Sequence, residues 1–302
     1  MWVYYKNGNY NVLLNKVNGT KIRYNKLNFL KPDRPESIDV KITNQCNHGC
    51  LFCHEASIPS GKQASYENMK KFAQSLAPYT EIAVGGGSLT DDWKHTQYFL
   101  EELQKVNAIP SITLHQEDFI EYSDIIEDWY LNGLIYGVGV SLSDAKDEEL
   151  HKTLSYFPTA VIHVIAGLFS EKDFDYIANK GYKLLVLGYK KFRRGNNYYV
   201  NYRQQLKENL KWLKNNFVEV SSSFNVLAFD NLALEQLDVC DEVSKKDWEQ
   251  FYMGDDGQFT FYVDLVENTY AKNSRSIVRF RNNNFNINEM FKDVQGRRYD
   301  TN

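Results

Sequence analysis

Between residues 37 and 220 the chain alternates short apolar segments with segments of helical periodicity. The predicted strands are Ser37–Ile42, Glu81–Val84, Pro110–Leu114, Ile135–Leu142, Ala160–Ile165 and Lys183–Leu187. The helices predicted between and after them are Ser65–Ala77, Asp91–Val106, Asp118–Tyr130, Asp147–Tyr156, Glu171–Asn179 and Tyr202–Asn216. Repeated strand–helix units predict an α/β fold in which a parallel sheet is covered by helices. Right-handed crossovers wind such a sheet into either a doubly wound sheet or a barrel.

Residues that can do chemistry recur just after these strands, which favours a barrel, because a barrel gathers functional groups at the carboxyl ends of its strands. We therefore predict a partial (β/α)6 TIM-like barrel over residues 37–220. Residues 1–36 read as small β-hairpins, since Asn7-Gly8 and Asn18-Gly19 supply the positive φ angles of tight turns. Residues 221–302 lack the repeat and are predicted to form an α+β extension packed on the barrel. Its expected elements are a strand at Phe224–Phe229, helices at Leu232–Leu237, Lys245–Phe251 and Ile287–Val294, and a hairpin through Gln258–Val263.

Composition excludes several classes of protein. The chain has 302 residues with 35 Lys+Arg against 39 Asp+Glu, a net charge of −4 that argues against a dedicated duplex-DNA binder. No stretch approaches the roughly 20 apolar residues of a membrane helix. Met1–Tyr10 has no apolar signal core, so we expect a cytoplasmic protein. Four cysteines are too few for a disulfide scaffold in so long a chain.

Three of those cysteines, Cys46, Cys50 and Cys53, fall within eight residues directly after the first predicted strand. At the spacing C-x3-C-x2-C three thiolates can converge on one cubane, each binding one iron of a [4Fe–4S] cluster. The fourth iron would then have no protein ligand. The alternative is a Cys3His zinc site that uses His48 or His54, which the absence of a second paired C-x2-C disfavours.

This triplet, with Phe52 before the third cysteine, resembles the motif of the radical S-adenosylmethionine (radical SAM) superfamily. The resemblance implies one [4Fe–4S] cluster on the three cysteines and SAM as the second cofactor. It further implies that one-electron reduction cleaves SAM to methionine and a 5′-deoxyadenosyl radical, which abstracts hydrogen from a substrate. An electron donor such as flavodoxin or ferredoxin is then an expected partner.

Gly85-Gly86-Gly87-Ser88 ends the second predicted strand. It resembles the Gly-Gly-Glu-Pro-like segment that holds the amino group of SAM in that superfamily. Gly87 and Ser88 replace the usual Glu and Pro, but backbone carbonyls can still accept hydrogen bonds from the ammonium. The alternative is a plain strand-to-helix turn or a phosphate nest, although the spacing of nucleotide-binding loops is absent.

Further along the chain, Ser141 and Ser143 lie at the end of the fourth predicted strand. In the resembling family, polar groups there approach the ribose and carboxylate of SAM; strand-end and capping roles are the alternative. His54-Glu55 either acts on the substrate or supports the cysteine loop.

The densest basic run follows the sixth strand and comprises Lys190, Lys191, Arg193 and Arg194. At the carboxyl face of a barrel these cations can meet the carboxylate of SAM or a phosphate-bearing substrate, and we assign Lys190 to the SAM site. A solvated loop is the alternative.

The fourth cysteine, Cys240, is isolated, and we expect a buried thiol. The alternatives are a thiyl hydrogen donor or a contact to the substrate. The segment from Met253 to Asp264, with Asn286–Phe291, resembles a SPASM/twitch-type extension without its cysteines. Auxiliary clusters are therefore not expected unless another chain supplies the ligands.

The resemblance thus predicts a radical SAM enzyme and leaves its acid–base residues unassigned. A peptide is the first candidate substrate, on the resemblance of the tail and of the fourth strand to peptide-modifying members. Two alternatives stay open: an enzyme that modifies a small molecule or nucleotide, and a regulatory module that keeps an iron–sulfur cluster or zinc without turnover.

Overall fold

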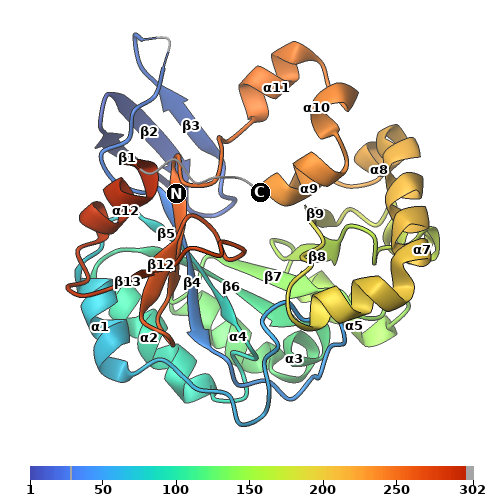
Figure 1. Ribbon diagram of the computed structural model, residues 1–302, viewed down its shortest axis with the longest axis horizontal. Helices are drawn as coiled ribbons and strands as arrows, with labels where there is room; N and C mark the ends of the chain where they lie inside the picture. The colour runs from blue at the N-terminus through green and yellow to red at the C-terminus, as the bar shows by residue number, and fades with distance from the viewer. Residues whose placement is uncertain (28, 297–302) are drawn as a thin grey trace.

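A mostly parallel sheet forms the centre of the computed structural model, which describes residues 1–27 and 29–296 (Figure 1). Its strand order is β10-β9-β8-β7-β6-β5-β4-β11-β12-β13. The first seven of these strands are β4 (Ser37–Thr43), β5 (Glu81–Gly86), β6 (Ile109–His115), β7 (Gly137–Ser141), β8 (Val161–Ile165), β9 (Lys183–Leu187) and β10 (Val226–Phe229). They are parallel and neighbour one another in chain order. Because every right-handed crossover then steps in one direction, the helices collect on one face. The partial barrel is confirmed, and the doubly wound alternative is wrong.

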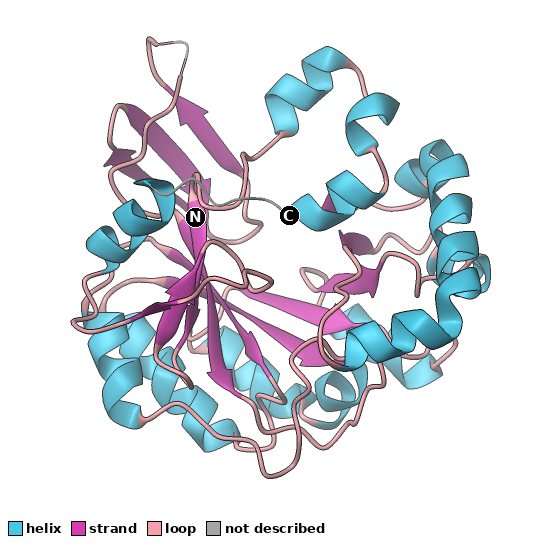
Figure 2. Ribbon diagram, viewed as in Figure 1, coloured by secondary structure: helices cyan, strands magenta, loops and turns pink. Residues whose placement is uncertain are grey.

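The helices cover the outer face of this curved sheet (Figure 2). They are α1 (Tyr66–Gln74), α2 (Trp93–Lys105), α3 (Gln116–Glu121), α4 (Ser123–Leu131), α5 (Glu148–Tyr156), α6 (Glu171–Ile177), α7 (Arg194–Asn215) and α8 (Phe217–Ser222). Ser65 caps α1, its side chain accepting a hydrogen bond from the Asn68 backbone N–H. The single helix predicted over Asp118–Tyr130 is in fact two, because Tyr122 leaves helical geometry at φ −104° and ψ 22°. Helix α7 begins before the predicted Tyr202, where it kinks.

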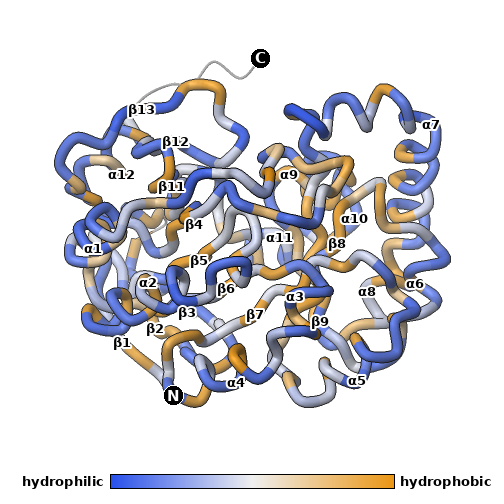
Figure 3. Tube along the Cα trace, turned by 90° about the horizontal axis from the view of Figure 1, so that it is seen from below, coloured by the Kyte–Doolittle hydropathy of each residue, from blue (hydrophilic) through white to orange (hydrophobic). Residues whose placement is uncertain are grey.

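Helix α7 alternates between hydrophilic and hydrophobic residues along its length (Figure 3). That pattern is typical of a helix with one face on the protein and the other in solvent. Among residues 1–27 and 29–296, no helix combines the length and apolar character needed to cross a membrane.

The two faces of the parallel sheet differ sharply in burial. Outward-facing residues such as Val40, Ile82 and Val140 are buried against the helices in one apolar core. Their neighbours on the inner, concave face, such as Ala83 and Thr113, are only half buried. Parallel strands covered on both faces are normally apolar throughout. The concave face of this barrel is therefore left accessible.

The C-terminal region adds strands to the same sheet. Its elements are α9 (Asn231–Gln236), α10 (Val239–Glu242), α11 (Lys245–Phe251), β11 (Thr260–Asp264), β12 (Thr269–Ala271), β13 (Phe280–Arg281) and α12 (Ile287–Gly296). Strand β11 pairs in parallel with β4, and β12 and β13 continue antiparallel. The predicted strand Phe224–Phe229 also joins the sheet, as β10 beside β9. A boundary between barrel and extension at residues 220 and 221 stays a prediction.

The N-terminal hairpins form a separate antiparallel sheet of β1 (Trp2–Asn7), β2 (Tyr10–Asn15) and β3 (Lys21–Tyr24). Gly8 allows the first turn, since its φ is +55° and a Cβ there would lie 1.9 Å from the Lys31 carbonyl oxygen. Buried Glu36, just before β4, accepts hydrogen bonds from the Tyr10 hydroxyl at 2.5 Å and the Arg23 guanidinium at 2.9 Å. These bonds attach the small sheet to the barrel.

Candidate metal and cofactor site

The cysteine triplet lies in the loop that leaves β4 at the carboxyl edge of the sheet. Cys46, Cys50 and Cys53 are half buried, and none forms a disulfide. The backbone N–H of Cys46 donates to the Ile58 carbonyl at 3.0 Å, and that of Cys53 donates to the Cys50 carbonyl at 3.2 Å. Gly49 turns the chain between them with a φ of +66°. The loop is thus folded back on itself, with its thiols partly accessible.

The electrostatics of the thiols suit a metal better than free thiolates. Burial raises the pKa of Cys50, and the charges of Cys46 and Cys53 raise it further. Burial also raises the pKa of Cys46, to which Asp91 and Cys53 contribute. Three sulfurs close enough to oppose one another's ionisation are stabilised when a metal replaces their protons. The donor set therefore fits a cluster bound by three cysteines.

A buried ion-pair network holds the segment just after Cys53. The Lys41 ammonium, on the concave face of β4, lies 2.9 Å from the Glu55 carboxylate and 2.8 Å from that of Asp264. Arg193 donates to the Glu55 carbonyl oxygen at 2.6 Å and to its carboxylate at 3.1 Å. Burial opposes ionisation of Glu55, but Lys41 and the other nearby cations lower its pKa overall. The network ties the cysteine loop to β4, β11 and α7.

The basic run clamps the cysteine loop. Arg194 donates to the Ser57 carbonyl oxygen at 2.8 Å. The Lys190 ammonium lies 3.5 Å from Nε2 of His54 and donates to the Ser274 hydroxyl at 2.9 Å. Lys190, Arg193 and Arg194 therefore contact the protein, and the alternative of a solvated loop is wrong for these three residues. Lys191 differs, because its ammonium lies over the Tyr199 ring, 4.0 Å from the centroid.

The two histidines considered as zinc ligands have other partners. In His48, Nε2 is 2.9 Å from Asp118 and Nδ1 is 3.2 Å from Glu117, while the ring stacks on His115 at 3.9 Å. Burial opposes protonation of His48, but the two carboxylates raise its pKa. In His54, burial and the Lys190 charge lower the pKa to about 3, so that ring is neutral. His54 and Glu55 therefore support the loop.

The glycine segment packs directly on the cysteine loop. The backbone N–H groups of Gly87 and Ser88 donate to the carbonyls of Thr43 and Gln45, each at 2.8 Å. A Cβ at Gly87 would lie 2.0 Å from the Gln45 carbonyl oxygen, so the close approach requires glycine.

The two flanking glycines play different parts. Gly86 has a φ of +135°, and a Cβ there would lie 2.3 Å from the Thr43 carbonyl oxygen. Gly85 has no atom within 4 Å of such a Cβ. Open space therefore lies over the sheet beside the loop.

Two polar residues of the concave face were not among the predicted site residues. The Asp39 side chain forms no hydrogen bond or ion pair with any residue in the described part of the chain. Burial raises its pKa to about 6; Asp256 and Asp230 contribute, and Lys190 opposes them. Its register neighbours on one side are small: Ala83 on β5, then Ser111 on β6 and Gly137 on β7.

The second is His163 on β8, whose ring covers Gly139 so closely that a Cβ there would lie 2.2 Å from Cε1. Its Nδ1 has no hydrogen-bond partner among the described residues, and burial lowers its pKa to about 4. The alternation of polar and apolar residues in β4 places Asp39 on the inner face but gives no sign of its surroundings, and His163 is the single polar residue of β8; neither was predicted as a site residue.

The two serines occupy different places. Ser141 ends β7 on the concave face, in register between His115 of β6 and His163 of β8. The backbone N–H of Ser143 donates to the Gln116 side-chain oxygen at 3.0 Å. Ser143 is not a helix cap, because Asp147 caps α5.

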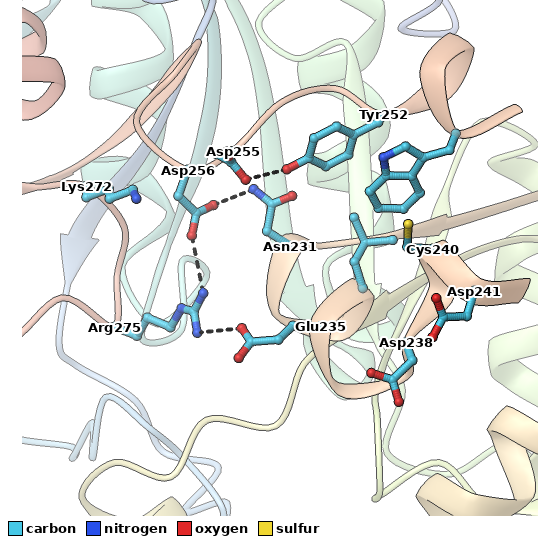
Figure 4. A pocket seen from close by; sticks show the side chains of 12 residues that line it. Asn231, Glu235, Asp238, Cys240, Asp241, Tyr252, Asp255, Asp256, Lys272 and Arg275 are labelled. Carbon is cyan, nitrogen blue, oxygen red and sulfur yellow. Dashed lines mark hydrogen bonds and ion pairs between the residues drawn. The ribbon is translucent and has the colours of Figure 1, made fainter. Parts of the chain in front are cut away.

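The remaining predicted residues, Phe52 and Cys240, lie in separate surroundings. Phe52 packs edge-on against Tyr198 of α7, with ring centroids 6.0 Å apart. Cys240 is exposed, so the predicted buried thiol is wrong: on the short helix α10 the neighbouring Val239 is the buried residue. The Cys240 thiol lines a cavity of about 460 Å³ (Figure 4).

No protein-family model matches this sequence, and no curated protein matches it. Solved structures do match the fold. SuiB of Streptococcus suis bound to S-adenosylmethionine has a TM-score of 0.63 at 11% identity, covering 97% of this chain and 87% of SuiB. A second SuiB structure has a TM-score of 0.60 at 11% identity over 99% and 90% of the two chains. Native anSMEcpe with bound AdoMet and Cp18Cys peptide has a TM-score of 0.54 at 12% identity over 86% and 80%. At such identities the likeness establishes that the chain has the fold of these proteins.

Proposed function

We propose that this protein is a radical SAM enzyme. One observation carries the proposal: three free cysteines at C-x3-C-x2-C spacing lie in the loop after the first barrel strand, packed against the Gly85–Ser88 segment. The loop is anchored by buried ion pairs and opens toward a concave face with free space over Gly85. A site that combines a metal-binding loop with an adjacent hollow suits a cluster whose open iron receives a second ligand.

Each residue of the site has a proposed role. Cys46, Cys50 and Cys53 bind one [4Fe–4S] cluster. Backbone groups of Gly85, Gly86 and Gly87, with Ser88 behind them, face the amino group of SAM. Ser141 borders the ribose, and Phe52 covers the cluster loop from the α7 side. When bound, the cluster supplies the electron that cleaves SAM to methionine and a 5′-deoxyadenosyl radical, and the protein orients both cofactors and excludes water.

Two residues are proposed with smaller roles. Ser143 is exposed at the rim of the site, where it would reach only the outer part of SAM. Lys190 already bonds to Ser274 and lies beside His54, so it would bring positive charge to the SAM carboxylate while holding the loop. Reduction would come from a donor such as flavodoxin or ferredoxin.

A peptide is the proposed substrate class. Native anSMEcpe, which shares the fold, was solved with a bound peptide. The alternative of a phosphate-bearing small molecule or nucleotide rested on the basic run. Arg193, Arg194 and Lys190 bind the cysteine loop, which removes the observation that favoured it.

The proposal is tested by anaerobic reconstitution with iron and sulfide. We expect about four irons and four sulfides per chain, lost in Cys46→Ala and kept in the matched control Cys240→Ala. The reduced protein should then convert SAM into 5′-deoxyadenosine and methionine. Stoichiometric zinc in place of iron, or a cluster that survives in Cys46→Ala, would overturn the proposal.

A further inference from the structure

A cavity of about 460 Å³ lies between helices α9, α10 and α11 and the loops that flank β11 and β12 (Figure 4). One wall is aromatic: the rings of Trp248 and Tyr252 stack at 4.6 Å with an angle of 14° between their planes. Five of the lining side chains are carboxylates and two are cations. The cavity therefore combines an aromatic surface with an excess of negative charge.

The protein neutralises only part of this excess: Lys214, outside the cavity, pairs with Asp238 at 2.7 Å. Arg275 lies between two of the carboxylates, 3.6 Å from Asp256 and 3.7 Å from Glu235. Asp241 and Asp255 are exposed and form no ion pair within the described residues; the Asp255 carboxylate accepts a hydrogen bond from the Tyr252 hydroxyl at 2.5 Å. Carboxylates beside an aromatic face are the chemistry that recognises ammonium and guanidinium groups.

Side-chain contacts connect this cavity to the cysteine loop. Asp256, on the cavity wall, accepts a hydrogen bond from the Asn273 amide at 2.6 Å. The next residue, Ser274, accepts from Lys190, and the Lys190 ammonium lies 3.5 Å from His54, the neighbour of Cys53. These contacts link the cavity wall to the cysteine loop through Lys190 and the segment that contains Asn273 and Ser274.

The concave face of the barrel carries a further carboxylate. The Asp39 side chain has no hydrogen-bond or ion-pair partner among the described residues; it lies on the concave face, reachable from the interior of the barrel but surrounded by protein atoms. Asp256 is close enough to raise the pKa of Asp39, together with burial, which contributes most. The Lys190 ammonium acts on Asp39 in the opposite direction, so Asp39 faces both signs of charge.

We infer that this cavity binds a positively charged group of the substrate, the ammonium or guanidinium of a basic side chain in a peptide or of a free amine. The inference rests on the proposed function, because it identifies the substrate class of the same site. A charged group held on the stacked rings by Asp241 and Asp255 would place the neighbouring part of the substrate at the mouth of the barrel. Inside the barrel, the Asp39 carboxylate would bind a second cationic group, or a hydrogen-bond donor, of the substrate.

The test uses the full-length reconstituted protein and fluorescein-labelled octalysine, with labelled octaglutamate as the opposite charge. The double variant Asp241→Asn/Asp255→Asn and, separately, Trp248→Ala should each weaken octalysine binding by about tenfold. The matched control is Glu127→Gln, an exposed acid on α4 away from the cavity, which should change the Kd by less than about twofold. Competition distinguishes the source of the cation: displacement by L-lysinamide indicates that a free amine suffices, and displacement by unlabelled octalysine alone indicates a peptide.

Two results would overturn the inference: octalysine that binds the wild-type protein no better than octaglutamate does, or a double variant that binds octalysine as the wild type does. The proposed function is tested separately, by 5′-deoxyadenosine formation in wild-type protein without any peptide. If the wild-type protein forms no 5′-deoxyadenosine but still binds octalysine, the result counts against the radical chemistry and not against the cation site.

Discussion

The two faces of one sheet have opposite characters in this protein. Along β5, Ile82 and Val84 face outward and are each 1% exposed, whereas the alternate residues Ala83 and Gly85 face a partly open interior. Successive side chains of a strand point to opposite faces, so one sequence serves both. The outer face carries the packing that stabilises the barrel. The side chains of the inner face are small or polar, so they contribute little hydrophobic stabilisation and leave room for ligands.

The outer face should give the largest loss of stability. Phe99 of α2 is fully buried against Phe72 and the outer face of the sheet. Phe99→Ala is expected to lower the free energy of unfolding by about 3–5 kcal/mol, because it removes buried contacts and leaves a cavity. Urea titration measures the change. Leu131→Ala, at a 78% exposed position on α4, is the control, and a similar loss in both variants would show that the outer face does not hold the fold.

On the inner face, Lys41 should contribute almost as much to the free energy of unfolding. Lys41 lies between the carboxylates of Glu55 and Asp264. Lys41→Met leaves those buried charges without their common cation, and breaking such a pair costs several kcal/mol. Arg193 and Arg279 remain near the two acids, so we expect a loss of about 2–3 kcal/mol in urea unfolding. Unchanged stability would mean that the network does not anchor the loop.

Two residues of the glycine segment have opposite surroundings: Gly87 packs tightly on the cysteine loop, whereas Gly85 faces open space. Gly87→Ala forces a Cβ against the Gln45 carbonyl oxygen and should cost about 1–3 kcal/mol by displacing the cysteine loop. Gly85→Ala, where the added carbon meets nothing within 4 Å, is the matched control and should leave the melting temperature unchanged. Equal destabilisation of the two variants would contradict the close contact between segment and loop.

The smallest expected effect is a pH-dependent one at Asp39. Its folded-state pKa of about 6 lies above the ordinary value of an aspartate, so the ionised carboxylate lowers stability at pH values above 6. This cost fades as the pH falls through 6 and is absent below about pH 4, where both states are protonated. Asp39→Asn should therefore raise the melting temperature by about 2 °C at pH 8 and not at pH 4. A shift that is equal at both pH values would show that the carboxylate is not perturbed.

The same comparison explains how far sequence reasoning reached. Short apolar segments between segments of helical periodicity predicted the strands, and the cysteine spacing predicted the loop, because both signals are local. The membership of β10 and β11 in the sheet depends on pairing between distant segments, which periodicity does not encode. Lys41 and Asp39 are polar positions of the alternating strand β4, and only the folded barrel shows which charges they face. Cys240 was predicted as buried from its residue type alone, whereas its short helix buries Val239 instead.

The central claim is that three cysteines hold a cluster whose remaining iron is open to SAM. Electron paramagnetic resonance of the anaerobically reconstituted, dithionite-reduced protein tests it most directly, recorded with and without SAM. We predict the signal of a reduced [4Fe–4S] cluster, with a spectrum that changes when SAM is added because SAM binds the open iron. A signal that is absent, or one that saturating SAM leaves unchanged, would contradict the account.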